Sequence, residues 1–225
     1  MATFVLIAGA GSDAWFWHRV VPELADQGHD VVAVDLPCDD DAAGLAEYTD
    51  TVVEAIGDRT DLVLVAQSMG AFTAPLVCDR VPVDLLVLVA AMVPAPGEAP
   101  GDWWANTGHA AALAAEAARL GVDPADPVQL FLHDVPPGLA AESAGHARDQ
   151  SGTPFEKPWP RDSWPDVPTR FVLCRDDRFF PADFLRHHVA ERLGIVPDEM
   201  DGGHLPMLSR PGELAERLLA YHAAG

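Results

Sequence analysis

Short apolar runs recur along the chain and predict strands that are covered on both faces. Five of them are rich in Val, Leu and Ile, do not alternate with polar positions, and occupy residues 3–8, 30–35, 61–67, 83–90 and 169–174. A weaker run covers 195–200. Helical periodicity fills the intervals at 15–27, 45–57, 69–80, 182–193 and 211–222. Unbroken apolar strands that alternate with helices are typical of parallel βαβ units. We therefore expect an α/β fold with a doubly wound, mostly parallel, six-stranded sheet.

The alternation breaks once, in a long segment with no evident strand. The segment opens with VPAPGEAPGDWW, contains helical stretches near 106–120, 126–133 and 138–150, and closes with SGTPFEKPWPRDSWPDVP. We divide the chain into a core, residues 1–91 and 168–225, and an inserted segment, residues 92–167. Open α/β sheets bind ligands at the carboxyl ends of their strands, so we expect this segment to form a helical lid there. A peripheral helical insertion is the alternative.

Composition and charge restrict the partners. Of 225 residues, 49% are apolar, which suits one domain with a sizeable core. The formal charge is −21, so we expect neither nucleic-acid nor membrane binding. Cys38, Cys78 and Cys174 are far apart and form no C-x-x-C pair, which argues against a zinc site or disulfide framework and favours a cytoplasmic location. Monomer and homodimer both remain open.

The stretch LVLVAQSMGAF ends a predicted strand on a serine. In a nucleophile elbow, the serine lies on a strained turn between strand and helix, and small neighbours let the two elements cross closely. Ala66 and Gly70 are small, although the first position of the usual Gly-x-Ser-x-Gly pattern is alanine. Ser68 could instead cap the helix. The stretch alone does not separate these two readings.

Further along the chain, acidic and histidine residues follow the later strands in the order that a serine nucleophile requires. Serine needs a base, and in elbow enzymes the acid follows a later strand and the histidine follows the last. Asp176 and Asp177 follow the strand at 169–174, and His204 lies in a glycine-flanked loop after the last strand. We favour Asp177 as the acid, since Asp176 could stabilise the turn. The other late histidines lie within a predicted helix or near the end of the chain: His187, His188 and His222.

The glycine-rich loop after the first strand, AGAGS, offers backbone N–H groups for an oxyanion. We expect one donor from Ala10 and the other from Met69, directly after the serine. The loop also matches part of a dinucleotide fingerprint, but large Trp15 follows at once and Asp35 is the only candidate for binding a ribose. That interpretation is a minor alternative, so we expect no organic cofactor. We also expect no metal.

With these motifs in this order, the sequence resembles the α/β-hydrolase superfamily, and more narrowly the small esterase and hydroxynitrile lyase-like branch that includes plant methylesterases. The matching stretches are FVLIAGAGSDAWFWHRVVPEL, HDVVAVDLP, LVAQSMGAF, PTRFVLCRDDRFFP and GGHLPMLSRPGEL. The resemblance implies Ser68 as nucleophile, His204 as base and Asp177 as acid. It also implies an oxyanion hole formed by the N–H groups of Ala10 and Met69.

Several positions depart from that branch. Ala8 and Gln67 stand where the branch usually has histidines. Hydroxynitrile lyases of this type carry a lysine where this chain has Leu205 and a threonine where it has Gly9. These differences disfavour cyanohydrin cleavage.

The sequence thus predicts a serine hydrolase that cleaves a small carboxylic ester through an acyl-enzyme. A cofactor-free lyase on the same fold and a ligand-binding, receptor-like homologue with slow turnover are the alternatives. The residues that we expect to line the substrate pocket are Gly9, Gly11, Trp15, Gln67, Trp103, Trp104 and Leu205.

Overall fold

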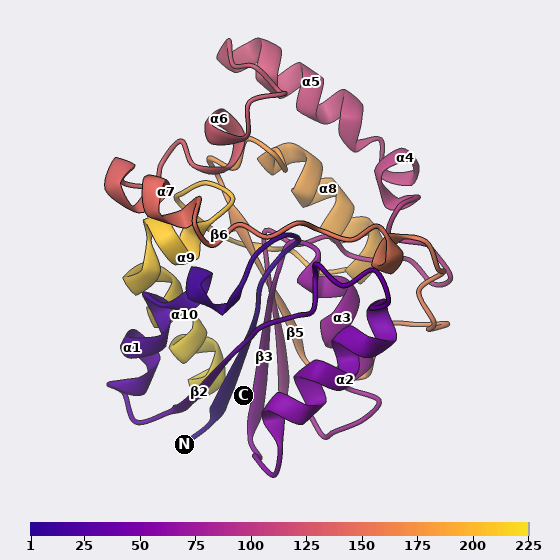
Figure 1. The fold of residues 1–225 in the computed structure, drawn as a ribbon, viewed down its shortest axis with the longest axis vertical. Helices are drawn as coiled ribbons and strands as arrows, with labels where there is room; N and C mark the ends of the chain where they lie inside the picture. The colour runs from indigo at the N-terminus through magenta and orange to yellow at the C-terminus, as the bar shows by residue number, and fades with distance from the viewer. Residues whose placement is uncertain (225) are drawn as a thin grey trace.

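A computed structural model describes residues 1–224 and contains one six-stranded sheet (Figure 1). The strands are β1 (Thr3–Ile7), β2 (Asp30–Val34), β3 (Leu62–Gln67), β4 (Leu85–Val89), β5 (Thr169–Cys174) and β6 (Asp198–Met200). They lie in the order β2-β1-β3-β4-β5-β6, and every neighbouring pair is parallel. The predicted six-stranded α/β fold is confirmed, and the sheet is parallel throughout.

Helices cover both faces of the sheet, as the unbroken apolar strands predicted. One face packs against α2 (Leu45–Ile56), α3 (Gly70–Val77) and α8 (Ala182–Leu193). The other packs against α1 (Val20–Ala25), α9 (Pro206–Ser209) and α10 (Pro211–Ala224). Successive strand residues point to opposite faces: Leu64 joins the first core layer, whereas Val63 and Val65 join the second. The fold is therefore doubly wound.

The first predicted helix is interrupted. Residues 15–27 do not form one helix, but a 3-10 turn, η1 (Ala14–Trp17), followed by α1 from Val20. Pro22 explains the break, because its ring would clash with the carbonyl of His18 in a continuous helix and it has no N–H to donate.

The inserted segment lies beyond the carboxyl ends of the strands, at the upper end of the sheet in Figure 1. It contains α4 (Trp103–Thr107), α5 (His109–Leu120), α6 (Pro127–Phe131), α7 (Pro137–Ser143) and the 3-10 turn η2 (Thr153–Phe155).

The three helices predicted here are all shorter in the structure, and the one expected at 126–133 spans only Pro127–Phe131. Gly108, with a φ of 68°, separates α4 from α5, so the expected helix at 106–120 begins only at His109. The helix expected at 138–150 ends at Ser143, and the chain then runs to the loop after β1. There Ala147 forms an isolated antiparallel bridge with Ser12. None of the helices within residues 1–224 combines the length and the apolar character needed to cross a bilayer.

Candidate active site

Ser68 occupies a strained turn between β3 and α3. Its φ is +52°, a left-handed value that is uncommon for a non-glycine residue. Two backbone hydrogen bonds hold it: its N–H donates to Val89 (3.1 Å), and its carbonyl accepts from the N–H of Met92 (3.0 Å). Its hydroxyl makes no capping bond to α3. The conformation is that of a nucleophile elbow and not of a helix cap.

Small residues on either side of Ser68 make this turn fit the sheet. A Cβ atom at Gly70 would lie 3.0 Å from the carbonyl oxygen of Ala8, so α3 crosses the end of β1 too closely for a side chain. Ala66 is fully buried and pairs in register with Ile7 on β1 and Leu88 on β4. Its single methyl group packs in the core layer beside α2 and α3, so alanine is accommodated there.

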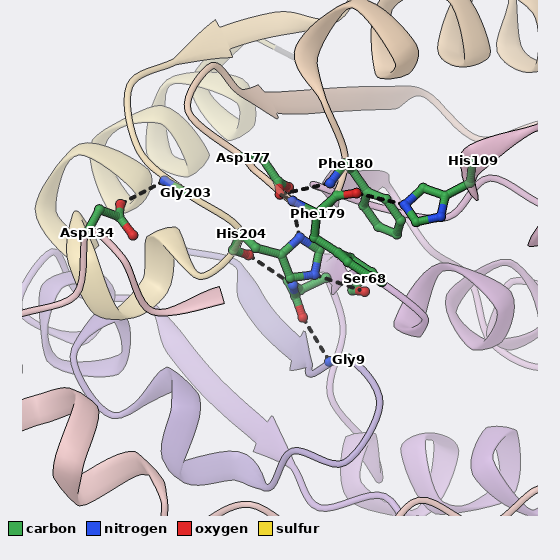
Figure 2. Close-up of polar contacts among 10 residues, drawn as sticks. Gly9, Ser68, His109, Asp134, Asp177, Phe179, Phe180, Gly203 and His204 are labelled. Atoms are coloured by element: carbon green, nitrogen blue, oxygen red, sulfur yellow. Dashed lines mark hydrogen bonds and ion pairs between the residues drawn. The ribbon is translucent and has the colours of Figure 1, made fainter. Parts of the chain in front are cut away.

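Ser68, His204 and Asp177 form a continuous chain of polar contacts (Figure 2). His204 Nε2 lies 3.2 Å from Ser68 Oγ, and His204 Nδ1 lies 2.8 Å from Asp177 Oδ2. Because a carboxylate can only accept, Nδ1 carries the proton and Nε2 is free to accept from the serine hydroxyl. All three residues are buried, with exposed fractions of 8%, 3% and 2% in the order named. This is the geometry by which a histidine can take a proton from serine.

Backbone groups fix the carboxylate of Asp177. Its Oδ1 accepts from the N–H groups of Phe179 and Phe180, both at 2.9 Å, which leaves Oδ2 to face the imidazole. Asp176 has a different partner. Its Oδ2 accepts from the N–H of Gly202 at 2.9 Å, and this hydrogen bond links the loops after β5 and β6. The structure thus brings Asp177, and not Asp176, to His204.

The glycine-rich loop after β1 is held by two glutamine side chains. Gln67 Oε1 accepts from the N–H of Gly9 (3.0 Å), and Gln150 Oε1 accepts from the N–H of Gly11 (3.0 Å). Between them, the N–H of Ala10 donates to no group within residues 1–224, and the same holds for the N–H of Met69. Both residues line the cavity beside Ser68, so these two donors are available to a bound molecule.

A cavity of about 330 Å³ opens at Ser68. The residues that line it are mostly apolar and come from both the core and the inserted segment. They are Gly9, Ala10, Ser12, Phe16, Gln67, Ser68, Met69, Met92, Trp104, Pro127, Phe131, Leu132, Ser143, Ala144, Ala147, Phe155, Phe179, His204 and Leu205. Within residues 1–224, no Asp, Glu, Lys or Arg lines this cavity.

Four of the residues expected in the pocket line it, namely Gly9, Gln67, Trp104 and Leu205. The other three, Gly11, Trp15 and Trp103, do not line it. Gly11 turns away with a φ of +63° and accepts from the N–H of Arg148.

Trp15 and Trp103 pack against other residues, away from the cavity. Trp15 stacks between His18 and His146, with ring centroids 4.4 and 4.3 Å away. Trp103 is fully buried, and its Nε1–H donates to the carbonyl of Val93 (3.0 Å). We correct the expectation for Gly11, Trp15 and Trp103 accordingly.

Two side chains from the inserted segment support the loops that carry Asp177 and His204 (Figure 2). His109 Nε2–H donates to the carbonyl of Phe179 at 2.7 Å, two residues after Asp177. Asp134 Oδ2 accepts from the N–H of Gly203 at 2.7 Å, directly before His204. Burial lowers the pKa of His109 and favours its neutral form, although the hydrogen bond to the Phe179 carbonyl acts in the opposite direction. Neither residue could be recognised from the sequence, because no local motif marks them.

Aromatic rings surround the imidazole of His204. The centroids of Phe131, Phe179 and Phe180 lie 5.2, 5.3 and 5.1 Å from it, all edge-on or tilted. Such an apolar shell strengthens the contacts of His204 with its two polar partners. As for metals, no three His, Cys, Asp or Glu residues in the described part of the chain are gathered closely enough to bind an ion.

Comparison with known sequences agrees with this geometry. A model of the Alpha/beta hydrolase family matches residues 4–217. Methylesterase 7 of Arabidopsis thaliana is 26% identical, and the alignment covers 96% of this chain and 94% of that protein. Norfluorocurarine synthase 1 from a Strychnos species is 24% identical over 96% of this chain and 93% of that protein.

Solved structures show the same fold. A pyrethroid hydrolase from Sphingobium faniae JZ-2 superposes with a TM-score of 0.78 at 23% identity, over 99% of this chain and 98% of that one. Polyneuridine aldehyde esterase superposes with a TM-score of 0.80 at 20% identity, over 98% and 99% of the two chains. The elbow at Ser68, the parallel sheet and the match over residues 4–217 lead to one conclusion: the chain belongs to the alpha/beta hydrolase family.

Proposed function

We propose that the protein is a serine esterase that hydrolyses a small, uncharged carboxylic ester. One observation carries the proposal. Ser68, which is linked through His204 to Asp177, lines the same cavity as Ala10 and Met69, whose backbone N–H groups have no partner within residues 1–224. The curated relatives support an ester substrate, since several are named methylesterases. In this proposal the inserted segment acts as a lid, because it supplies much of the cavity wall.

The reaction proceeds in two halves. Ser68 Oγ attacks the ester carbonyl while His204 Nε2 takes the hydroxyl proton, and Asp177 stabilises the resulting imidazolium. The N–H groups of Ala10 and Met69 bind the oxyanion, each contributing about 3 kcal/mol. The alcohol leaves with the proton from His204. Water, deprotonated by His204, then attacks the acyl-serine, and the acid departs as Ser68 regains its proton.

The cavity wall favours an uncharged substrate on both sides of the ester bond. An ionised group that enters an apolar cavity loses its hydration and needs a charged or strongly polar partner. Within residues 1–224 the lining offers no Asp, Glu, Lys or Arg, and its side chains with polar groups are those of Ser12, Gln67, Ser68, Trp104, Ser143 and His204. A volume of about 330 Å³ lies near the lower end of the range for small-molecule pockets, which favours a small ester.

The lyase alternative finds no specific support in the cavity. Leu205, which follows the base directly, lines the cavity with an apolar side chain. A cyanide leaving group is anionic, and the part of the lining that residues 1–224 supply contains no lysine or arginine to stabilise it.

The test compares wild type with Ser68→Ala on p-nitrophenyl butyrate. We expect the variant to lose at least about 1,000-fold in kcat, because the nucleophile is removed, with an unchanged circular dichroism spectrum. Undiminished turnover by the variant would refute the proposal.

A second comparison uses methyl pentanoate and monomethyl glutarate, which match in length but differ by a terminal carboxylate. We expect kcat/KM to be at least about 100-fold higher for the uncharged ester. Tight binding of one ligand with negligible turnover of all esters would instead indicate a receptor-like protein.

A further inference from the structure

The side chain of Gln67 joins the two loops that meet at Ser68. Gln67 is the last residue of β3 and is only 1% exposed. Its Oε1 accepts from the N–H of Gly9 (3.0 Å), in the loop after β1, and its Nε2 donates to the carbonyl of His204 (3.1 Å), in the loop after β6. These partners lie 58 and 137 residues away in the sequence. One carboxamide therefore connects the neighbour of Ala10 to the backbone of His204.

The orientation of the amide follows from its partners. A backbone N–H only donates and a carbonyl only accepts, so the oxygen must face Gly9 and the nitrogen must face His204. The fit at Gly9 is close: a Cβ atom there would lie 2.5 Å from Gln67 Oε1 and 2.9 Å from the Cβ of Ser68. Glycine is required because the loop approaches both Gln67 and Ser68 at this point.

Among residues 1–224, no other side chain hydrogen-bonds both to the loop of Gly9 and to the loop of His204. Ala8, which precedes Gly9, carries only a methyl group and is buried in the apolar core. Gln150 holds the far side of the glycine loop through Gly11, but its other hydrogen bonds go to Cys38, Tyr48 and Ser151. Within residues 1–224, the side chain of Gln150 therefore forms no hydrogen bond with the loop of His204.

We propose that Gln67 is a positioning residue that sets the distance between the Ala10 oxyanion donor and the His204 base. The inference rests on the proposed esterase function and goes beyond it. In the transition state, the oxyanion and the transferred proton lie on opposite sides of Ser68, so both loops must hold their places at once. Displacing a catalytic group by about 1 Å can cost about 100-fold in rate.

The isosteric change Gln67→Glu gives a signature that a packing role would not. When protonated, the new carboxyl can accept from Gly9 and donate to His204, as the amide does. When ionised, it can only accept, so it repels the carbonyl of His204 and opposes the oxyanion. Burial favours the protonated form and raises the pKa of such a carboxyl. The ratio of variant to wild-type kcat should therefore rise as the pH falls.

The experiment measures kcat and KM for p-nitrophenyl butyrate between pH 5 and 8 in wild type, Gln67→Glu, Gln67→Met and Gln150→Met. At pH 8 we expect both Gln67 variants to lose about 100-fold in kcat, with KM within threefold of wild type. At pH 5 the Gln67→Glu ratio should recover at least about 10-fold. Gln150→Met is the matched control, because it removes one bond to the same loop, and it should lose less than Gln67→Met.

Binding of a butylboronic acid, which forms a tetrahedral adduct with the serine, provides a second readout. We expect its Kd to rise in step with the loss of kcat at Gln67, because both need the same loop positions. If Gln67→Met does not fold, the pH series of Gln67→Glu still decides.

Three results would overturn the positioning role: kcat within threefold of wild type in both Gln67 variants, a loss in Gln67→Glu that does not vary with pH, or a loss in Gln67→Met no larger than that in Gln150→Met. Turnover that survives Ser68→Ala would instead refute the esterase proposal itself, so the two failures are distinguishable.

Discussion

A hydrogen bond between Asp134 and Gly203 connects the inserted segment to the loop that carries His204. Asp134 Oδ2 accepts from the N–H of Gly203 at 2.7 Å, and a Cβ atom at Gly203 would lie 2.6 Å from Asp134 Oδ1. Gly203 directly precedes His204 in the chain. Asp134 follows α6, so the segment between β4 and β5 supports the position of His204 from outside the sheet.

Replacing Asp134 by alanine should lower kcat about 10-fold. The change leaves the N–H of Gly203 without its acceptor, and an unpaired buried donor costs about 1–3 kcal/mol, which loosens the loop of His204. Asp134→Asn keeps an acceptor oxygen and should stay within about threefold of wild type. Steady-state kinetics on p-nitrophenyl butyrate tests both, and equal rates for Asp134→Ala and wild type would show that the contact has no influence on the base.

The neighbouring aspartates should behave very differently when each is changed to asparagine. Asp177→Asn should lose about 1,000- to 10,000-fold in kcat, because a neutral amide neither fixes the required tautomer of His204 nor stabilises its charged form. Asp176→Asn still offers an oxygen to the N–H of Gly202 and should lose less than about fivefold. The comparison is a kcat measurement at pH 8, and a greater loss at Asp176 would reverse the assignment.

His188 should make the protein less stable in mild acid. It lies against Trp103 and Phe184, and burial lowers its pKa to about 4, with Arg192 contributing. Below pH 6.5 His188 is protonated in the unfolded chain, but in the folded protein it stays neutral down to about pH 4. The free energy of unfolding therefore decreases as the pH is lowered from 6.5 to 4.

Urea unfolding of wild type and His188→Leu at pH 7 and pH 5 checks this. Other titrating groups are common to both proteins, so their contributions cancel in the comparison. Between these pH values, wild type should lose about 2 kcal/mol more than the variant. Equal losses in the two proteins would mean that His188 does not remain neutral in the fold.

Much of this fold could be predicted because its strands are buried on both faces. An unbroken apolar run such as residues 62–66 reads as a parallel strand without knowledge of its neighbours. Ser68, Asp177 and His204 each follow a predicted strand, and the carboxyl ends of parallel strands share one edge of the sheet. Topology alone therefore brings them together.

The remaining features depend on contacts that no local pattern encodes. The partners of Gln67 are 58 and 137 residues away, and its neighbours in sequence give no sign of either. The inserted helices α4, α6 and α7 have only five to seven residues each, so tertiary packing decides which side chains face the cavity. For this reason the sequence does not predict that Phe131 on α6 lines the cavity, nor that Trp103 on α4 is buried away from it.

The central claim is that Ser68 is a nucleophile activated by His204. Reaction with a fluorophosphonate probe, followed by intact-mass and peptide analysis, tests this most directly. The account predicts one adduct per chain, located on Ser68, with labelling slowed at least about 100-fold in His204→Ala and absent in Ser68→Ala. An adduct on another residue, or a wild-type protein that takes up no probe, would contradict it.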